Sequence, residues 1–286
     1  MPNTKRKEYP ECAIENRLQI TSVFTLFKRR FANDYTFQGE AHDFTEVVCV
    51  VDGKVGVTAD KNVYVLSAGQ MILHPPSEFH AIWSDCGSEP EVIIFSFRAA
   101  AFPDLPKFLF SVPSEQIREL KQIAEDAKEI FDSDGESILG VRPKAEARAA
   151  VLLKRLEIFL LSVFDGPDRT HAKINGAKQQ GRSVENYRAI LSYMEKHIGE
   201  PLSIDEIAGH CNMSVPAVEK TVKRYLGCGA MSYFNTMKML RAAEMLSGGA
   251  SVKETALSVG FSNQNYFSAR FKKWSGVAPS EWKSVR

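Results

Sequence analysis

The C-terminal third of the chain carries one pattern of residues twice, and this duplication constrains the fold more than any other feature. Five positions between 203 and 214 recur at a constant offset, and after one inserted residue the pattern continues to a glycine in each copy. The matching pairs are Ser203 and Ser251, Ile204 and Val252, Glu206 and Glu254, Ala208 and Ala256, Ser214 and Ser262, Val218 and Phe267, Val222 and Phe271, Lys223 and Lys272, Arg224 and Lys273, and Gly227 and Gly276. Such self-similarity predicts two like supersecondary units joined by a connector.

Each copy has the pattern of two short helices separated by a tight turn. A serine followed three residues later by a glutamate predicts a capping box at the start of the first helix. Apolar residues then follow at helical spacing, and a turn at residues 212–213 or 260–261 precedes a second serine, which is expected to cap the second helix. In a helix-turn-helix unit of this kind, the second helix is the one that enters the major groove of DNA.

Two stretches of the C-terminal region resemble a known family. GFSNQNYFSARFKKWSGVAPSEWK is similar to the C-terminal signature of AraC/XylS-type bacterial transcription regulators, and YFNTMKMLRAAEML resembles their linker helix. Two positions depart from the family pattern, because Lys238 replaces the usual arginine and Pro216 replaces a larger contact residue. The resemblance implies a regulator that is not an enzyme, with double-stranded DNA and RNA polymerase as partners.

The resemblance also assigns residues to the DNA. Base edges are expected to meet Pro216, Glu219, Lys220, Gln264, Asn265 and Ser268. Phosphates are expected to meet Lys223, Arg224, Lys272 and Lys273. The chemistry agrees, because lysine donates to guanine, glutamate accepts from the cytosine amine, and glutamine or asparagine pairs with adenine. The alternative for each residue is an ordinary solvated surface position.

Charge is divided unequally along the chain. Residues 182–286 hold 14 Lys and Arg against 9 Asp and Glu, a net charge of +5, while the rest of the chain has a net charge of −4. The positive part contains the duplicated unit, and a positive surface favours binding to a phosphate backbone.

In the N-terminal part of the chain, the hydrophobic pattern has a period of two residues. Short β-rich runs separated by turn residues extend from residue 18 to about residue 97, which predicts a small antiparallel β-barrel. Asp52-Gly53, between two such runs, predicts a two-residue hairpin.

Within the predicted barrel, residues 41–80 resemble a degraded cupin pattern. His42, Glu46 and Gly53 match the first cupin motif, and Gly69, Pro75 and His80 match the second, while Glu40 and Ser77 replace expected residues. The ligand set is therefore incomplete, and neither a metal nor another cofactor is expected.

Three roles remain open for the polar residues of this pattern: ordinary core positions, contacts with a small-molecule effector, or ligands of a metal ion. The predicted effector pocket consists of His42, Glu46, His80 and Trp83, with Phe79 as a further apolar wall. The alternative function is a metal-dependent cupin enzyme that carries a DNA-binding tail.

Two amphipathic helices are expected after the strands. The first begins at Ser114, and the second is apolar over more of its circumference than one barrel face requires. The resemblance implies a homodimer formed through Leu152, Leu153, Leu156, Phe159 and Leu160. The alternative is that both helices only pack on the barrel.

The predicted fold class is therefore α+β with two domains: a cupin-like antiparallel β-barrel with a helical pair, then an all-α domain with two helix-turn-helix units joined by a linker helix. The expected segments are a flexible arm (residues 1–17), the sensor domain (18–110), the helical pair (111–164), a linker (165–183) and the DNA-binding domain (184–286). No signal peptide or membrane span is expected, so the protein is predicted to be cytoplasmic. Cys49 and Cys211 are expected as buried free thiols.

Overall fold

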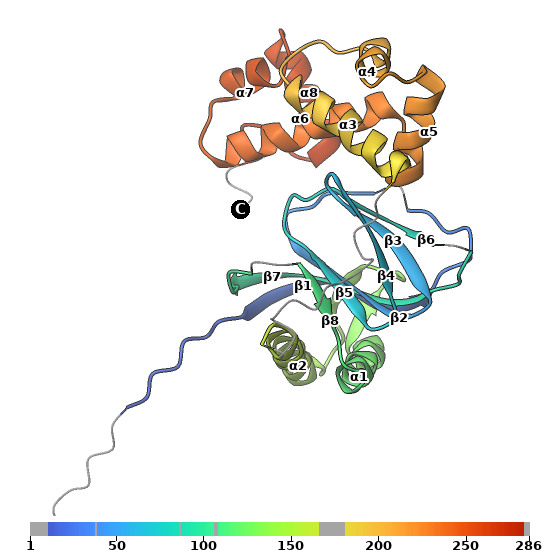
Figure 1. Ribbon diagram of the computed structural model, residues 1–286. Coiled ribbons are helices and arrows are strands. Elements are labelled where there is room, and N and C mark those ends of the chain that lie inside the picture. Colours follow the sequence, from blue (N-terminus) through green and yellow to red (C-terminus); the bar gives the residue numbers. More distant parts are fainter. Residues whose placement is uncertain (1–10, 38, 86, 106–107, 166–180, 283–286) are drawn as a thin grey trace, which may run out of the picture.

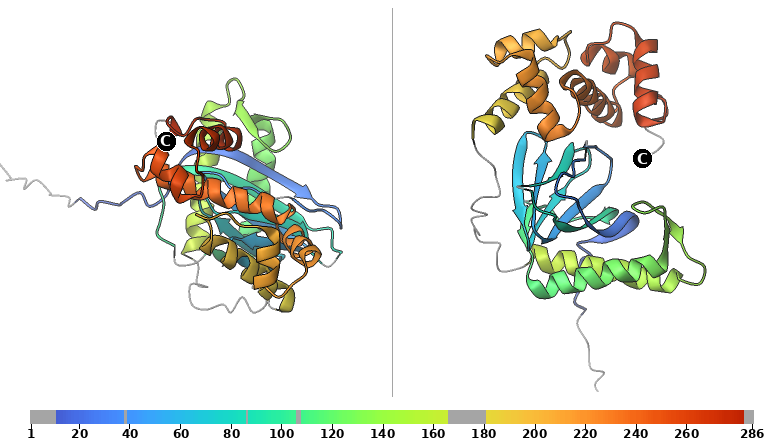
Figure 2. Two further views of the ribbon diagram at one scale, coloured as in Figure 1. Left: turned by 90° about the horizontal axis from the view of Figure 1, so that it is seen from above. Right: turned by 90° about the vertical axis from the view of Figure 1, so that its right-hand side faces the viewer.

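The computed structural model describes residues 11–37, 39–85, 87–105, 108–165 and 181–282. Two β-sheets form the centre of the molecule, with helices α1 and α2 on one side and the six C-terminal helices on the other (Figures 1 and 2). Most of the predicted linker lies outside the described residues, and so does the start of the predicted arm. No described helix is both long enough and apolar enough to cross a bilayer.

The N-terminal strands form two antiparallel sheets. The larger sheet has the order β1 (Gln19–Arg30), β7 (Glu91–Ala101), β2 (Thr45–Asp52), β5 (Gln70–His74) and β8 (Leu109–Ser111). The smaller sheet has the order β4 (Asn62–Ser67), β3 (Lys54–Ala59) and β6 (His80–Ser84). Within the described residues no ladder joins the two sheets, so the closed barrel of the prediction is here a pair of facing sheets.

Strand β2 shows how the sequence builds the two faces of the larger sheet. Val47 and Cys49 point to a core shared with α1 and α2, whereas Val48 and Val50 point to the core between the two sheets. Successive side chains of a strand alternate between faces, so Glu46 lies on the side of Val48 and Val50, in the interior between the sheets. A carboxylate therefore stands in line with two buried valines.

The predicted hairpin at Asp52-Gly53 is wrong. Strand β2 pairs with β5 and β7, and β3 pairs with β4 and β6, so the chain crosses from one sheet to the other at this point. Gly53 has φ +73°, and a Cβ there would lie 2.9 Å from Cα of Pro90. The glycine thus permits a tight corner rather than a two-residue turn within one ladder.

Helices α1 (Ser114–Ile130) and α2 (Glu146–Phe164) cover the outer face of the larger sheet, and the short strands β9 (Phe131–Ser133) and β10 (Ile138–Val141) connect them. The predicted contact residues of a dimer are used in this packing. Four of the five are at most 3% exposed, and Leu153 packs partly buried against the same core. The four are Leu152, Leu156, Phe159 and Leu160. Burial against the sheet already uses most of this apolar stripe, and a dimer formed through these side chains stays a prediction.

The C-terminal domain contains α3 (Arg182–Lys196), α4 (Ile204–His210), α5 (Val215–Leu226), α6 (Ala230–Ser247), α7 (Val252–Ser258) and α8 (Gln264–Ser275). Both predicted capping boxes are present, at the starts of α4 and α7. Each second helix ends at a left-handed glycine, Gly227 or Gly276.

The cap of α8 differs from the prediction by one residue. Asn263, not Ser262, caps this helix, and its side chain accepts hydrogen bonds from the backbone N–H groups of Asn265 and Tyr266. The inserted residue of the second copy therefore lies in the turn before the cap, and Asn263 corresponds to Ser214, the N-cap residue of α5.

The two domains contact each other through the smaller sheet. In the β3–β4 hairpin, the carbonyl oxygen of Asp60 accepts a hydrogen bond from the Tyr187 hydroxyl at 2.7 Å, and that of Lys61 accepts from Arg188 Nε at 3.3 Å. Helix α5 packs against β3 and β6, and Val63 and Phe79 belong to the hydrophobic core of the first helix-turn-helix unit.

Candidate nucleic-acid interface and sensor-domain site

The second helix of the first unit, α5, presents several predicted contact residues to solvent. Pro216 and Lys220 are exposed near its N-terminus, and Lys223 and Arg224 are exposed toward its C-terminus. Val218 and Val222 are fully buried on the opposite face, so packing fixes which side of the helix is free. This is the arrangement that a helix needs to approach base edges at one end and phosphates along its length.

Glu219 has a partner within the domain. Its Oε2 atom accepts a hydrogen bond from the backbone N–H of Ala230 at 3.1 Å, at the first residue of α6. The carboxylate thus satisfies a free donor at a helix N-terminus, where negative charge is favourable. One of the two carboxylate oxygens is therefore used within the domain, and the reading of a cytosine by Glu219 stays a prediction.

The second helix of the second unit, α8, exposes Gln264 and Asn265 in its first turn, while Ser268 is half-buried. Phe267 and Phe271 are fully buried, as expected for core positions. Sequence reasoning missed two exposed residues on this helix, Tyr266 and Arg270. Helical spacing could have indicated both, because neither lies on the stripe that Phe267 and Phe271 define.

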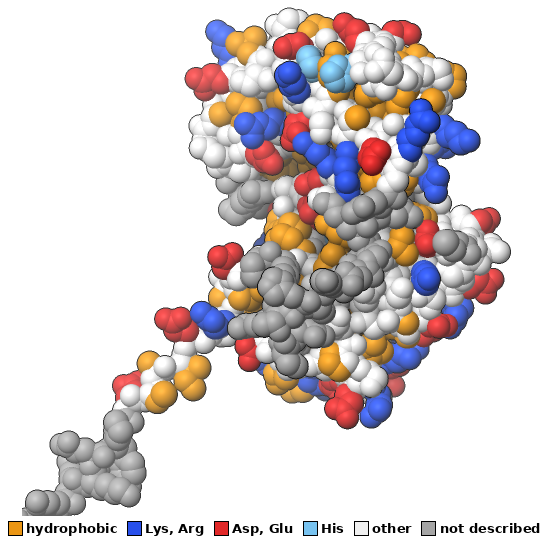
Figure 3. Space-filling model, viewed as in Figure 1, with side chains coloured by type: hydrophobic (Ala, Val, Ile, Leu, Met, Phe, Trp, Pro, Cys, Tyr) orange, Lys and Arg blue, Asp and Glu red, His pale blue; other side chains and the backbone are white. Residues whose placement is uncertain are grey.

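The predicted phosphate contacts are free to meet a ligand. Within the part of the chain that the structure describes, Lys223, Arg224, Lys272 and Lys273 are exposed and form no ion pair with a carboxylate. Figure 3 shows Lys and Arg side chains gathered at the side of the C-terminal domain where Figure 1 draws α5. These cations are therefore not neutralised within the protein, which suits them to counterion release on DNA.

Lys238 of the linker helix α6 joins the two units. It is 6% exposed, and its Nζ donates to the carbonyl of Glu200 at 3.1 Å and to that of Val259 at 2.9 Å. Burial lowers the pKa of this ammonium group. Gly260 has φ +79°, and a Cβ there would lie 2.8 Å from both the carbonyl oxygen of Gly199 and Lys238 Nζ, so a glycine is required in the turn of the second unit.

In the sensor domain, the structure brings together three of the four residues of the predicted effector pocket. His42, Glu46 and His80 form one cluster with Glu40, and one ligand atom of each lies within 4.8 Å of the others. His80 Nε2 is 3.2 Å from Glu46 Oε1, and His42 Nε2 is 3.7 Å from Glu46 Oε2. We refer to Glu40, His42, Glu46 and His80 as the polar cluster.

The ionisation of the cluster reflects its burial and its charges. Partial shielding of its carboxyl group from solvent raises the pKa of Glu40, although the residue as a whole is exposed, and the negative charge of Glu46 raises this pKa further. Burial opposes ionisation of Glu46 as well, but the His42 and His80 imidazoles hold its pKa far below the usual range. Although burial disfavours an imidazolium ion at His80, the contact with Glu46 raises the His80 pKa.

The fourth residue of the predicted pocket, Trp83, lies elsewhere. Its ring covers Gly56 on the outer face of the smaller sheet and meets Tyr225 of α5 with ring centroids 5.8 Å apart. Phe79 also faces outward, against Tyr233 of α6. Both aromatic side chains therefore belong to the contact between domains and are not walls of an interior pocket.

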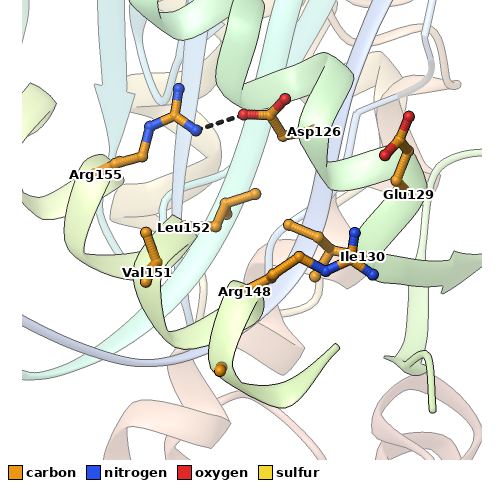
Figure 4. Close-up of a pocket in the computed structure, with 8 residues that line it drawn as sticks. Asp126, Glu129, Ile130, Arg148, Val151, Leu152 and Arg155 are labelled. Carbon is orange, nitrogen blue, oxygen red and sulfur yellow. Dashed lines mark hydrogen bonds and ion pairs between the residues drawn. The ribbon is translucent and has the colours of Figure 1, made fainter. Parts of the chain in front are cut away.

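A surface groove of about 360 Å³ lies between α1 and α2 (Figure 4). Asp126 and Arg155 form an ion pair across it, and Arg155 also donates to Glu119 at 2.8 Å. Beside this groove, α2 exposes two apolar residues spaced by two helical turns, Val151 (60% exposed) and Ile158 (64%). Among the described residues of α2, these two are the exposed large apolar side chains.

Both domains match known protein families. The profile of the AraC-like ligand binding domain matches residues 23–153, and that of a helix-turn-helix domain matches residues 207–284. The polar cluster lies within the first match, and the exposed faces of α5 and α8 lie within the second.

Three relatives have named functions. The HTH-type transcriptional regulator GbdR of Pseudomonas aeruginosa is 25% identical over 115 residues, 40% of this chain and 31% of GbdR. The HTH-type transcriptional regulator ArgR of the same species is 36% identical over 131 residues, 46% of this chain and 39% of ArgR. The HTH-type transcriptional activator RhaS of Escherichia fergusonii is 23% identical over 266 residues, 87% of this chain and 88% of RhaS.

The match thus spans 31% of the length of GbdR and 39% of that of ArgR. The match to RhaS extends over most of both chains. A ligand-binding domain followed by two helix-turn-helix units, each matched in its expected place, identifies the chain as a member of the AraC family.

Proposed function

We propose that this protein is a sequence-specific DNA-binding transcription regulator whose N-terminal domain binds a ligand. The observation that carries the proposal is the pair of second helices, α5 and α8. Both present exposed polar residues near their N-termini and, toward their C-termini, cations that form no ion pair with any described carboxylate. Two such helices on one chain could meet successive major-groove segments, roughly 34 Å apart along the duplex.

The residues divide into two groups by chemistry. Lys220 is suited to donate to guanine, and Gln264 and Asn265 to pair with adenine, because each has the donors and acceptors that these bases present. Pro216 and Ser268 have shorter side chains and would contact bases beside the same two helix N-termini. The four cations toward the ends of the helices would contact phosphates and supply affinity without sequence preference.

A footprint tests this proposal on the full chain. The purified protein is incubated with the DNA upstream of its own gene, and protection is expected over two adjacent major-groove segments on one face of the duplex. A chain that is folded by circular dichroism but gives no protection there, and no sequence-dependent affinity in a selection from random duplexes, would overturn the proposal.

We further propose that a second copy of the chain docks on α2. Val151 and Ile158 form an exposed apolar strip beside the α1–α2 groove, and the same strip on a second copy would bury both in a self-complementary contact. A homodimer would place two DNA-binding domains on one promoter. Contact with RNA polymerase is proposed from family membership alone.

A further inference from the structure

We propose that the polar cluster of Glu40, His42, Glu46 and His80 binds one divalent transition-metal ion. This inference deepens the proposed function, because it gives the chemical class of the ligand that the N-terminal domain takes. The ion site itself rests only on the geometry of the sensor domain. Its regulatory meaning rests on the proposed DNA-binding function.

The four side chains converge on one point. One ligand atom from each lies within 4.8 Å of the other three. Four ligands held tetrahedrally at about 2.0–2.2 Å from one ion stand roughly 3.3–3.6 Å apart, so the most widely separated of these atoms would have to approach each other by up to about 1.5 Å. Side-chain rotation alone provides a movement of this size.

Backbone hydrogen bonds fix the protonation of both histidines. The Nδ1 atom of His42 lies 2.9 Å from the carbonyl oxygen of Phe44, and that of His80 lies 3.0 Å from the carbonyl oxygen of Glu78. A carbonyl oxygen only accepts, so each Nδ1 carries a proton, and in a neutral imidazole the lone pair is then on Nε2. Metal-binding histidines in proteins are commonly held in this way by their second nitrogen.

The two Nε2 atoms are the groups that lack a partner. Both are buried and have no hydrogen bond within the described residues, and the His80 side chain is only 5% exposed. Leaving a buried polar atom without a hydrogen-bond partner is energetically unfavourable. A cation between the imidazoles and the carboxylates would satisfy both nitrogens at once.

The alternative is an ion pair between Glu46 and two imidazolium ions. That arrangement requires each Nε2 proton to point at a carboxylate oxygen. His42 Nε2 is 3.7 Å from Glu46, which is beyond hydrogen-bond distance, and His80 Nε2 at 3.2 Å does not have the alignment of a hydrogen bond. It also leaves the second carboxylate, Glu40, without a role.

Strand pairing holds three of the four residues of the polar cluster in place. Glu40 and His80 exchange two backbone hydrogen bonds, of 2.9 and 3.0 Å, so these residues are directly paired and present their side chains on the same face. Glu46 is held in the middle of the larger sheet, opposite His74 on β5 and Ser96 on β7. The site therefore joins both sheets.

The donor set indicates the class of ion. Two imidazole nitrogens with two carboxylate oxygens suit Zn²⁺ and its neighbours Fe²⁺, Co²⁺ and Ni²⁺, whereas Mg²⁺ and Ca²⁺ prefer oxygen ligands alone. Glu40 is exposed, so the cluster opens to solvent on its side and an ion can enter without unfolding of the sheets.

The cluster lies one residue away from the domain contact. His80 points into the sensor domain, whereas its neighbour Phe79 meets Tyr233 of α6 at a centroid distance of 4.8 Å. A shift of the chain at His80 on ion binding would therefore be transmitted to Phe79. The ion is placed to change how firmly the DNA-binding domain is held.

The test uses the full chain after removal of metal by a chelator. Titration with Co²⁺ should give ligand-field absorption bands that saturate at one ion per chain, and Zn²⁺ should abolish them by competition. His80→Gln should lower the affinity by at least about 100-fold, and Glu40→Gln by about tenfold. His210→Gln is the matched control, because this exposed histidine lies in the other domain and its loss should change nothing.

Two results would overturn the ion site: no uptake by the chelator-treated protein, or uptake that both His80→Gln and Glu40→Gln leave unchanged. Glu40 is exposed, so loss of folding cannot explain the effect of its substitution. Uptake is measured without DNA, and failure of the metal site is thus distinguishable from failure of the proposed function. If Zn²⁺ binds but leaves the DNA affinity unchanged, the regulatory part of the proposal is overturned and the site is retained.

Discussion

Lys238 of α6 donates a hydrogen bond to the carbonyl oxygen of Val259 at 2.9 Å, and through this contact the linker helix is tied to the turn of the second helix-turn-helix unit. The same ammonium group reaches Glu200, before α4 of the first unit. One buried side chain thus bridges both units, which fixes their relative orientation as DNA recognition by two helices requires.

Substitution of Lys238 should weaken the contact between the two helix-turn-helix units and lower the stability of the protein. Lys238→Met removes the donor to the buried carbonyl oxygen of Val259 and to the partly buried carbonyl oxygen of Glu200, and we expect the free energy of unfolding to fall by about 1–3 kcal/mol. Lys238→Arg keeps the donors and should cost less. Chemical denaturation measures both variants, and a Lys238→Met protein as stable as the wild type would contradict the assigned role.

Lys220 and Lys272 should differ in what they contribute to DNA binding. Lys220→Ala should relax preference at one or two base pairs and cost about 1–3 kcal/mol, whereas Lys272→Ala should weaken all sequences alike and reduce the salt slope by about one. Fluorescence anisotropy at several salt concentrations distinguishes these effects. Lys196→Ala, an exposed lysine on α3, serves as the control.

Tyr187 should help to hold the two domains together. Its hydroxyl donates to the carbonyl of Asp60 at 2.7 Å, so Tyr187→Phe should weaken the docking by about 1 kcal/mol while the ring packing remains. Faster hydrogen exchange in the β3–β4 hairpin is the expected readout. The control is Tyr266→Phe, because Tyr266 is exposed on α8 and distant from the contact. Equal exchange in both variants would exclude this role.

The same contact should depend on pH through Asp60. Burial and the charge of Glu78 raise the Asp60 pKa from 3.8 to about 6, against the opposing effect of its hydrogen bond from the Phe79 N–H. The folded protein therefore binds this proton more tightly than the unfolded chain, and the resulting stabilisation is lost as the pH rises through about 6.

Asp60→Asn removes that dependence. The melting temperature of the variant, relative to the wild type, should therefore rise between pH 4 and pH 7. Asp34→Asn, at an exposed position, should show no such trend. A constant difference between Asp60→Asn and the wild type across this range would show that the carboxyl group is not perturbed.

The exposed face of α2 should control the oligomeric state. Replacing Val151 and Ile158 together by aspartate adds two charges to the proposed contact, and we expect a dimer to become a monomer in light scattering at micromolar concentration. Both positions are exposed, so folding should be unaffected. A wild-type protein that is already monomeric at high concentration would refute the dimer proposal.

Much of the fold could be predicted because local patterns specify it. Ser203 and Ser251, with their glutamates, gave correct starts for α4 and α7, since a capping box depends only on nearby residues. Alternating apolar residues likewise located the strands. The corner at Gly53 was mistaken for a hairpin because the same two residues serve both, and only long-range strand pairing distinguishes them.

The functional sites were predicted less well, because they depend on contacts between residues far apart in the sequence. Glu219 was interpreted only as a base contact because its hydrogen bond to Ala230 depends on how α5 and α6 meet, which no local pattern encodes. Glu40 was interpreted only as the replacement of a usual histidine, because nothing local shows that the two sheets bring its carboxylate close to Glu46 and His80. Trp83 was assigned to the interior, but its position in β6 directs it to the outer face.

The domain contact touches the two helix-turn-helix units unequally. The core that contains Val63 and Phe79 of the sensor domain extends over α3 to the first half of α6, while the core around Phe267 and Phe271 of the second unit includes no sensor-domain residue among those described. Any change in the N-terminal domain must then arrive at α5 first and reach α8 only by way of α6. Ligand binding in the N-terminal domain should accordingly affect the two promoter segments unequally. Occupancy of the segment under α5 should rise or fall, while occupancy of the segment under α8 stays comparatively constant.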